Sequence, residues 1–190
     1  MAFLNTSQLS ALGLRSCGEN VLISNKASIY RASQISLGNH VRIDDFCILS
    51  GGDGGIWIED HVHIACYSSL IGKGAIKLEN FSNISARVSI YSSSDDYSGA
   101  HMTNPTIPAE FTNVDHRPVI IGRHAIVGCG SIVLPGVKIG DGCAVGALSL
   151  VKDDCQPFTM YAGIPAHVVG KRDCGLVTLE RRFLEMYKRG

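Results

Sequence analysis

Two adjacent carboxylates, Asp95 and Asp96, are the side chains of this 190-residue sequence best suited to act as a general base. They come just after Ile90, the last of a regular series of apolar residues, and stand near the start of a polar segment, residues 91–118. A carboxylate that is held against a rigid element and covered by a loop can accept a proton from a nucleophile. Aspartate in a serine-rich turn also commonly caps backbone amides, so a purely structural role is the alternative.

Histidines are the second group that could carry chemistry. His101 and His116 lie in the same polar segment and are either catalytic or simply solvated. His40, His61 and His124 occupy equivalent positions of a repeat, which predicts that they stack along one corner, with Phe81 between the last two; the alternative is a zinc site like that of the gamma-class carbonic anhydrases. That family's GHxxxxHGC-like arrangement is absent, and histidine tolerates the left-handed turn conformation, so we expect stacked turn residues and no metal.

A six-residue repeat must position these groups. Aliphatic residues open successive blocks at Ile121, Val127, Val133, Ile139, Val145 and Val151, and smaller residues follow four places on at Ala125, Ser131, Val137, Cys143, Ser149 and Cys155. This period fits neither a helix nor a hairpin, and it predicts an all-β solenoid of short parallel strands joined by tight turns. The first and fifth residues of each block are expected to point inward. His63 then stands outward on a flat face, where it could contact an acceptor or a neighbouring subunit.

Three insertions interrupt the repeat at intervals that place them on one edge. They are the Gly-rich residues 51–55, the surplus around Gly72-Lys73-Gly74, and the long polar segment 91–118. If three blocks make one triangular coil, all three insertions leave from the same corner, which is the expected signature of a binding edge. The long segment contains aromatic and apolar residues, so we expect an ordered external loop that packs on a neighbour.

The chain is interpreted as one domain, residues 1–190, with attachments at both ends. Residues 1–16 form an N-terminal helical cap, in which Asn5 caps the helix and Gly13 ends it; residues 20–155 form the β-helix. Residues 156–190 form an exit segment and a C-terminal helix. In that helix, Leu176 to Lys188, the inward face is predicted to be Leu176, Leu179, Phe183, Leu184 and Tyr187, with Glu180, Arg181 and Glu185 outside.

Composition narrows the class of protein. The formal charge is zero at pH 7 and no basic run stands out, so nucleic acid is not expected as a partner. No apolar stretch reaches the roughly 18 residues of a membrane span. Seven cysteines without a CxxC pair favour a reduced, cytoplasmic protein over a disulfide framework.

The repeat and the segment that follows it, YAGIPAHVVGKR, resemble the left-handed parallel β-helix (hexapeptide-repeat) acyltransferases. The resemblance covers about residues 20–172 and implies a left-handed coil and a homotrimer with active sites in clefts between neighbouring solenoids. It also implies that acetyl-CoA lies along the C-terminal coils. The residues that would contact it are Gly128, Ala147, Ile164 and Pro165 for the pantetheine arm, and Lys171 and Arg172 for the phosphates.

Many sugar O-acetyltransferases of this family carry a catalytic histidine in a segment like IYTATH, and here that histidine is replaced by Asp95. The stretches VRIDDFCILSG and IYSSSDDYSG are more similar to N-acyltransferases of nucleotide-linked 4-amino-4,6-dideoxyhexoses, which make surface-polysaccharide sugars such as violosamine or anthrose derivatives. This implies acetyl transfer to the 4-amino group of a sugar linked to a nucleotide, dTDP in our interpretation. Asp95 is then the base, with Asp96 second, and His63, Tyr97 and His101 contact the sugar nucleotide. An O-acetyltransferase with a histidine base, a zinc hydratase and a non-catalytic solenoid are the alternatives.

Overall fold

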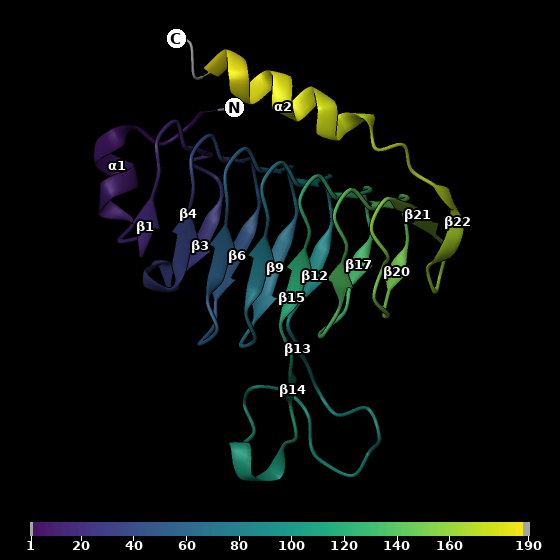
Figure 1. Ribbon diagram of the computed structural model, residues 1–190. Helices are drawn as coiled ribbons and strands as arrows, with labels where there is room; N and C mark the ends of the chain where they lie inside the picture. Colours follow the sequence, from purple (N-terminus) through teal and green to yellow (C-terminus); the bar gives the residue numbers. More distant parts are fainter. Residues whose placement is uncertain (1, 188–190) are drawn as a thin grey trace.

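The computed structural model, which describes residues 2–187, is a three-sided parallel β-solenoid of about seven turns (Figure 1). Each side is a sheet whose strands pair in parallel with their equivalents on the next coils, except that the last strand of the second sheet, β22, pairs antiparallel with β21. The first sheet contains β1 (Ser16–Cys17), β4 (Ile35–Leu37), β7 (Ile56–Ile58), β10 (Ile76–Leu78), β15 (Val119–Ile121) and β18 (Lys138–Ile139). The second contains β2 (Leu22–Ile23), β5 (Arg42–Ile43), β8 (His63–Ile64), β11 (Asn83–Ile84), β16 (Ile126–Val127), β19 (Ala144–Val145), β21 (Thr159–Ala162) and β22 (His167–Lys171). The third contains β3 (Ser28–Tyr30), β6 (Ile48–Gly51), β9 (Ser69–Gly72), β12 (Ser89–Tyr91), β17 (Ile132–Val133) and β20 (Leu150–Val151).

The hydrophobic core fills the inside of the coil, and the six-residue repeat determines which residues enter it. All twelve residues predicted to point inward between Ile121 and Cys155 are buried. Full burial of an aliphatic side chain stabilises the fold by roughly 1.5–3 kcal/mol, and successive coils repeat this contribution. Cys143 and Cys155 take inward positions, as expected for small apolar side chains, and all seven cysteines are free.

Three corners join the sheets, and each has its own character. We call the turn from the first to the second sheet the helix corner, that from the second to the third the exit corner, and that from the third back to the first the loop corner. At the helix corner His40, His61, Phe81 and His124 all adopt φ values between 55° and 62°. Their rings stack in that order at centroid distances of 4.6, 4.9 and 4.9 Å, which confirms the predicted ring stack.

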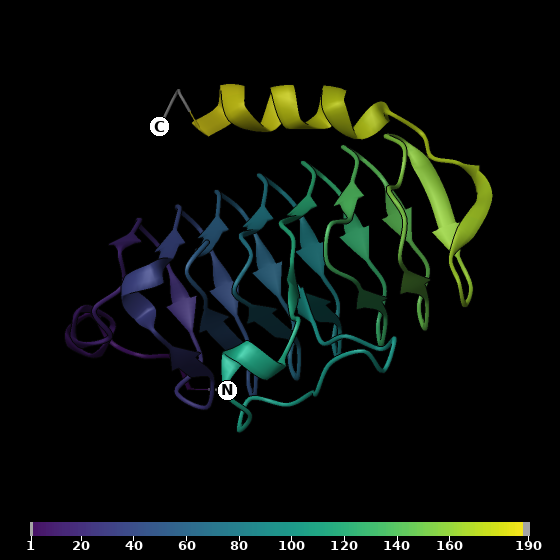
Figure 2. The ribbon, with the colours of Figure 1, turned by 90° about the horizontal axis from the view of Figure 1, so that it is seen from below.

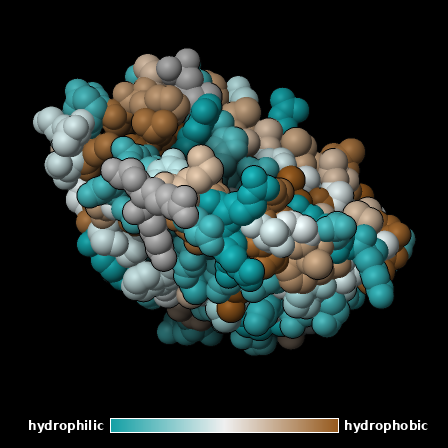
Figure 3. Space-filling view, turned by 45° about the horizontal axis from the view of Figure 1, so that its top comes forward, coloured by the Kyte–Doolittle hydropathy of each residue, from teal (hydrophilic) through white to brown (hydrophobic). Residues whose placement is uncertain are grey.

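The C-terminal helix α2 (Gly175–Tyr187) runs along the helix corner, as Figure 1 shows. Phe183 packs its ring edge against His61 and Phe81. The predicted orientation of α2 is wrong at Glu180, which is its buried residue rather than an outward one. The cause is a tertiary contact: Arg123 and His124 at the helix corner bind the Glu180 carboxylate, so this side chain faces the solenoid. Leu179 and Leu184 are exposed instead, and in Figure 3 hydrophilic residues separate the hydrophobic groups on this side. Lys188 lies outside the described residues.

The two ends of the solenoid differ from the expected bounds. The N-terminal helix α1 (Thr6–Ala11) has the predicted Asn5 cap, with a reciprocal hydrogen bond to Gln8. Strand pairing already begins at Ser16, within the segment expected to be only a cap, and β21 adds a further parallel strand after Cys155. Tyr161 of β21 is buried and closes the C-terminal end of the core. No helix within residues 2–187 is long and apolar enough to cross a membrane.

Candidate active site at the loop corner

Stacking between coils dictates the structure of the loop corner. Strands β6 and β9 end at Gly51 and Gly72, and the third insertion follows β12 on the next coil, so all three insertions leave from one edge as the sequence predicts. Gly72 has φ 141°, and a Cβ there would lie 2.3 Å from Ser92 Oγ. Glycine is therefore required at this position because the next coil occupies the space of a side chain.

The external loop begins and ends as an antiparallel ribbon of β13 (Ser93–Ser94) and β14 (Asp115–His116), with a short 3₁₀ helix, η2 (Ala109–Phe111), between them. Its root is fixed to the coil below, because Lys73 N donates to Ser93 Oγ at 2.7 Å and Ser92 Oγ donates to Gly74 O at 2.8 Å. Ser93 Oγ also lies 2.7 Å from His116 Nδ1. Figure 2 shows the loop crossing the coils, with η2 displaced toward the N-terminal end. The loop is ordered and anchored, as predicted.

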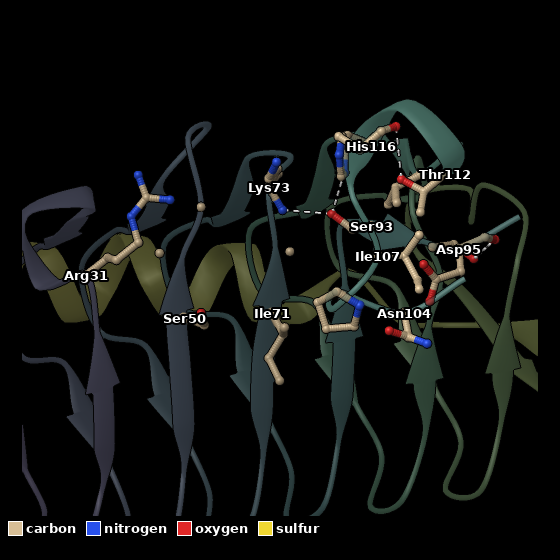
Figure 4. A pocket seen from close by; sticks show the side chains of 17 residues that line it. Arg31, Ser50, Ile71, Lys73, Ser93, Asp95, Asn104, Ile107, Thr112 and His116 are labelled. Carbon is tan, nitrogen blue, oxygen red and sulfur yellow. Dashed lines mark hydrogen bonds between the residues drawn. The ribbon is translucent and has the colours of Figure 1, made fainter. Parts of the chain in front are cut away.

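Two hollows flank the ribbon, and Asp95 lines both of them. The N-terminal hollow has a volume of about 580 Å³ and includes Arg31, Gly52, Lys73, Asp95, Asn104 and Ile107. The C-terminal hollow has a volume of about 400 Å³ and includes Asp95, Asp96, Asn113, Arg117, Leu134 and Lys152. Figure 4 shows Arg31 and Asp95 toward the two ends of the N-terminal hollow, with Lys73 and His116 between them.

The two candidate bases, Asp95 and Asp96, differ in their hydrogen bonds. The Asp95 side chain is exposed and makes no hydrogen bond or ion pair within residues 2–187. The Asp96 carboxylate accepts hydrogen bonds from Ser98 N at 2.7 Å and His101 Nδ1 at 2.6 Å. Hydrogen bonds from Ser98, followed by that from His101, lower the pKa of Asp96 to about 2. Asp96 thus has the turn-capping role that was the structural alternative, while Asp95 is available to a ligand.

The predicted sugar-binding residues are not gathered in one place. Tyr97 is adjacent to Asp95 in the C-terminal hollow but is 92% exposed. His101 binds Asp96 and lines neither hollow. His63 stands outward on the second sheet, where its Nε2 lies 2.9 Å from Asp44 Oδ2 and its Nδ1 lies 3.2 Å from Asn83 Oδ1. A single chain therefore does not bring His63 to Asp95.

The residues expected to contact the pantetheine arm of acetyl-CoA lie at the exit corner, across the third sheet from Asp95. Gly128 and Ala147 are neighbours on successive coils, since a Cβ on Gly128 would lie 2.5 Å from Ala147 N. Ile164 of the exit segment is exposed, and Gly163 O accepts from Leu150 N at the start of β20, which places this segment on the same edge. Ala147 and Ile164 are thus both exposed at the exit corner.

Lys171 ends β22 and Arg172 follows it, and the two side chains differ in their contacts. Arg172 Nη1 donates to the backbone oxygens of His124, Gly142 and Cys143 at 3.0–3.1 Å. Arg172 therefore ties the exit segment to the helix corner, a structural role that the sequence does not reveal. Lys171 is exposed at the end of β22.

Sequence reasoning did not select Arg31 or Lys73 as site residues. The signal was present, because Lys73 stands within the second insertion and Arg31 fills a repeat position that is normally aliphatic. Both are brought to the loop corner by the same period that places Asp95 there.

The corner histidines do not form a metal site. Their rings are nearly parallel to their neighbours, at interplanar angles of 3–10°, so they stack and do not converge on one point. Within residues 2–187 no group of three or more His, Cys, Asp or Glu side chains could hold a metal ion.

Comparison with known proteins places this geometry in a family. Residues 118–153 match the family model described as bacterial transferase hexapeptide (six repeats). The solenoid and this match define a hexapeptide-repeat transferase.

Full-length relatives narrow the class. An Escherichia coli dTDP-4-amino-4,6-dideoxy-D-glucose acyltransferase is 55% identical over 183 residues, which are 96% of this chain and 95% of that protein. The solved structure of AntD, an N-acyltransferase from Bacillus cereus, in complex with dTDP and 3-hydroxybutyryl-CoA superimposes with a TM-score of 0.94 at 44% identity, covering 98% of each chain. AntD has also been solved with dTDP-4-amino-4,6-dideoxyglucose and coenzyme A, as a serine-to-alanine variant. A putative lipopolysaccharide biosynthesis O-acetyl transferase of E. coli K12 is 30% identical over 78% of this chain and 74% of that protein. The chain belongs to the hexapeptide-repeat acyltransferase family that includes the E. coli and B. cereus enzymes.

Proposed function

We propose that this protein transfers the acetyl group of acetyl-CoA to the 4-amino group of dTDP-4-amino-4,6-dideoxyglucose, for the synthesis of O-antigen or another surface polysaccharide. The proposal is supported by the 55% identity to a dTDP-4-amino-4,6-dideoxy-D-glucose acyltransferase over almost the whole chain. AntD has been solved with dTDP and 3-hydroxybutyryl-CoA, and a variant of it with dTDP-4-amino-4,6-dideoxyglucose and coenzyme A. The choice of acetyl as the acyl group is our own, since AntD is bound to a 3-hydroxybutyryl thioester.

The observation that carries the mechanism is an uncommitted carboxylate, Asp95, shared by two hollows. A free sugar amine is already nucleophilic and must only lose its extra proton during or after attack. The amine attacks the thioester carbonyl, Asp95 accepts the amine proton, and the tetrahedral intermediate collapses to an amide and the thiolate of coenzyme A. The proton then passes from Asp95 to the thiolate. A backbone amide of the C-terminal coils stabilises the oxyanion.

The proposed homotrimer is supported by the positions of the two halves of this site. Asp95 lies at the loop corner, while Gly128 and Ala147 lie at the exit corner of the same chain, at opposite edges of the third sheet. A second copy that sets its exit corner against the loop corner brings acetyl-CoA to Asp95. Three copies related by a cyclic axis repeat this contact and close the ring.

In that arrangement, acetyl-CoA runs along Gly128, Ala147, Ile164 and Pro165. Lys171 binds a phosphate of acetyl-CoA. Arg172 assists through the guanidinium nitrogens that do not bind backbone oxygens. Tyr97 and His101 contact the acceptor from the loop, and His63 contacts it from the neighbouring subunit. Free thiols at all seven cysteines fit a reducing compartment, so the proposed location is the cytoplasm.

The decisive experiment incubates the protein with acetyl-CoA and either dTDP-4-amino-4,6-dideoxyglucose or its 4-hydroxy counterpart, and follows thiol release. We expect turnover with the amine only. Asp95→Asn should lower kcat by about 10²–10⁴, the usual contribution of a positioned base, while the affinity for coenzyme A stays nearly unchanged. Turnover of the 4-hydroxy sugar alone would refute the N-acyltransferase assignment, and near-normal turnover by Asp95→Asn would remove Asp95 from its role.

One observation favours sugar O-acetylation as the second candidate. His101 Nδ1 is held by Asp96 at 2.6 Å, which leaves Nε2 as a possible base. Loss of activity in His101→Asn, with activity retained in Asp95→Asn, would favour this candidate. His116→Asn tests the other loop histidine in the same assay.

A further inference from the structure

We propose that the outer face of the first sheet carries a second binding site, which takes an uncharged hexopyranose against Trp57. The site is separate from that of the proposed function and goes beyond it. Its lining residues come from β1, β4, β7 and β10 and from the turns after them, and none of those described lines either hollow beside Asp95. The hollow has a volume of about 760 Å³. Ligand pockets are typically about 300–1,000 Å³, so this space suits a sugar ring or a short saccharide.

Trp57 supplies one apolar wall of this hollow, and two contacts fix its position. Its Nε1 donates to Gly54 O at 3.1 Å, and the guanidinium carbon of Arg15 lies 4.6 Å from the centroid of its ring. Trp57 is nevertheless 41% exposed, and Arg15 does not line the hollow, so the indole surface that lines the hollow is uncovered. A pyranose presents C–H groups on one face of its ring, and these pack favourably on the electron-rich face of an aromatic side chain.

Ser36 supplies a hydroxyl that has no partner among the described residues. It pairs with Trp57 in the register of β4 and β7, so both side chains stand on the outer face of the first sheet. Ser36 is only 9% exposed and lines the hollow, yet its Oγ makes no hydrogen bond within residues 2–187. Buried polar groups are normally hydrogen-bonded, and leaving one without a partner costs free energy. A ligand hydroxyl that binds Ser36 Oγ recovers this cost.

The wall toward the helix corner is polar and carries a free donor. Asn80 Oδ1 accepts from Asp60 N at 2.8 Å, whereas the Asn80 NH₂ group makes no hydrogen bond in the described part of the chain. The Asp60 carboxylate accepts from Asn39 N at 2.7 Å, and a Cβ on Gly38 would clash with it, so it is held directly over the backbone of the turn after β4. The hollow thus offers donors and acceptors together. Sugar hydroxyls match this combination, because each of them both donates and accepts.

The charges of the hollow disfavour a phosphorylated ligand. Glu59 and Asp60 line it, and Lys77 is the one cation among its described lining residues. The Lys77 ammonium is already bound, at 2.8 Å from Glu59 Oε1 and 3.0 Å from Glu79 Oε1. A phosphate would therefore meet an excess of negative charge, whereas an uncharged sugar meets no such repulsion. The same repulsion disfavours a nucleotide sugar or coenzyme A in this hollow.

Trp57 is the only tryptophan of the chain, so tryptophan fluorescence reports directly on this hollow. The intact protein is titrated with methyl α-D-glucopyranoside, with maltotriose and, as the charged counterpart, with glucose 1-phosphate. Tryptophan emission measures binding to the wild type and to Ser36→Ala. Saturation-transfer NMR of the sugars measures binding to Trp57→Ala, which lacks the fluorophore. The matched control is Ser28→Ala, because Ser28 pairs with the exposed Ile48 on the outer face of the third sheet.

We expect methyl α-D-glucopyranoside to change the emission of the wild type with a Kd in the millimolar range, which is typical of a small ligand with few polar contacts. Ser36→Ala should weaken binding about two- to tenfold, the loss expected for one hydrogen bond, and Ser28→Ala should bind normally. Trp57→Ala should show no saturation transfer. Tighter binding of maltotriose would identify a saccharide chain as the ligand, and equal binding a single sugar; both results support the site.

Three results would overturn the inference. They are no emission change and no saturation transfer with either neutral sugar, tighter binding of glucose 1-phosphate than of the neutral sugars, and equal affinities in Ser36→Ala and Ser28→Ala. Acetyl transfer at the loop corner should be unchanged in Ser36→Ala, so neither outcome of this experiment bears on the proposed function.

Discussion

Replacement of Glu180 by glutamine should release the C-terminal helix from the solenoid. The Glu180 side chain is 4% exposed, and Oε2 accepts hydrogen bonds from His124 Nε2 at 2.8 Å and from Arg123 Nη2. It is the buried residue of α2, and the helix also makes ring contacts at the helix corner through Phe183 and Tyr187. The docking of α2 therefore depends strongly on one carboxylate.

The expected magnitude follows from what glutamine keeps and loses. Breaking a buried ion pair by removing one partner costs about 3–5 kcal/mol, but glutamine retains the shape and one acceptor oxygen, so we expect about 2 kcal/mol. The coils below keep their own ladder hydrogen bonds when the helix undocks, so the loss appears in local opening rather than in global unfolding. A change of about 2 kcal/mol corresponds to roughly 30-fold faster amide exchange in residues 175–187, with little change in Tm.

The pH dependence of this effect has a definite sign. Burial raises the pKa of Glu180, but the hydrogen bonds and charges of Arg123 and His124 outweigh burial and lower it overall. A carboxylate whose pKa is lower in the docked state stabilises docking above its ordinary pKa of about 4.3. That stabilisation is lost as the pH falls through the docked-state pKa. The difference between wild type and Glu180→Gln should therefore be present at pH 6 and shrink below about pH 4.3.

Hydrogen exchange with mass spectrometry, corrected for the intrinsic exchange rate at each pH, measures this opening. Glu185→Gln is the matched control, because Glu185 is exposed on the same helix. If the two variants exchange at the same rate in residues 175–187 at pH 7, the Glu180 ion pair does not hold the helix.

Three further predictions concern the site and its support. Asp96→Asn should keep much of the activity that Asp95→Asn loses, and it should increase amide exchange in the loop, because Asp96 caps a turn; equal kcat losses in steady-state assays would contradict this division. Coenzyme A should raise the Tm of the wild type by binding the native state, and Ala147→Trp, which puts a bulky ring on the exposed exit corner, should abolish that shift while its own Tm stays near the wild-type value. Gly99→Ala should cost about 1–2 kcal/mol for positive φ alone, and Gly72→Ala clearly more, because a Cβ has open space at Gly99 and meets the next coil at Gly72; equal unfolding free energies in urea would show that coil stacking is not tight at Gly72.

The sequence predicts the solenoid and the insertions at the loop corner, because both follow from the spacing of the apolar residues. Every six-residue block repeats one environment, so the inward residues and the edge that carries insertions can be read from spacing. The choice between Asp95 and Asp96 could not be read this way. It depends on the turn that brings Ser98 N and His101 to Asp96, and that turn lies outside the six-residue repeat.

Glu180 and Arg172 show the same limit for the C-terminal segment. Helical periodicity assigns a charged residue to solvent, yet Glu180 faces Arg123 because the helix packs on a corner that carries cations. Arg172 is proposed to assist at a phosphate, and its guanidinium also donates to three turn carbonyls. In both cases the partner lies at least 29 residues away in the sequence, so only the folded chain reveals it.

A final prediction tests whether the site is shared between chains. Asp95→Asn removes the base at the loop corner, and Ala147→Trp blocks the exit corner of the same chain, so each variant alone should be inactive. If a site uses the loop corner of one copy and the exit corner of another, co-refolding the two variants at equal ratio leaves about a quarter of the sites with both corners intact, because each corner is wild type with a probability of about one half. Activity should therefore return to about a quarter of the wild-type value per site. If each chain contains a complete site, every chain in the mixture still carries one defect and no activity returns.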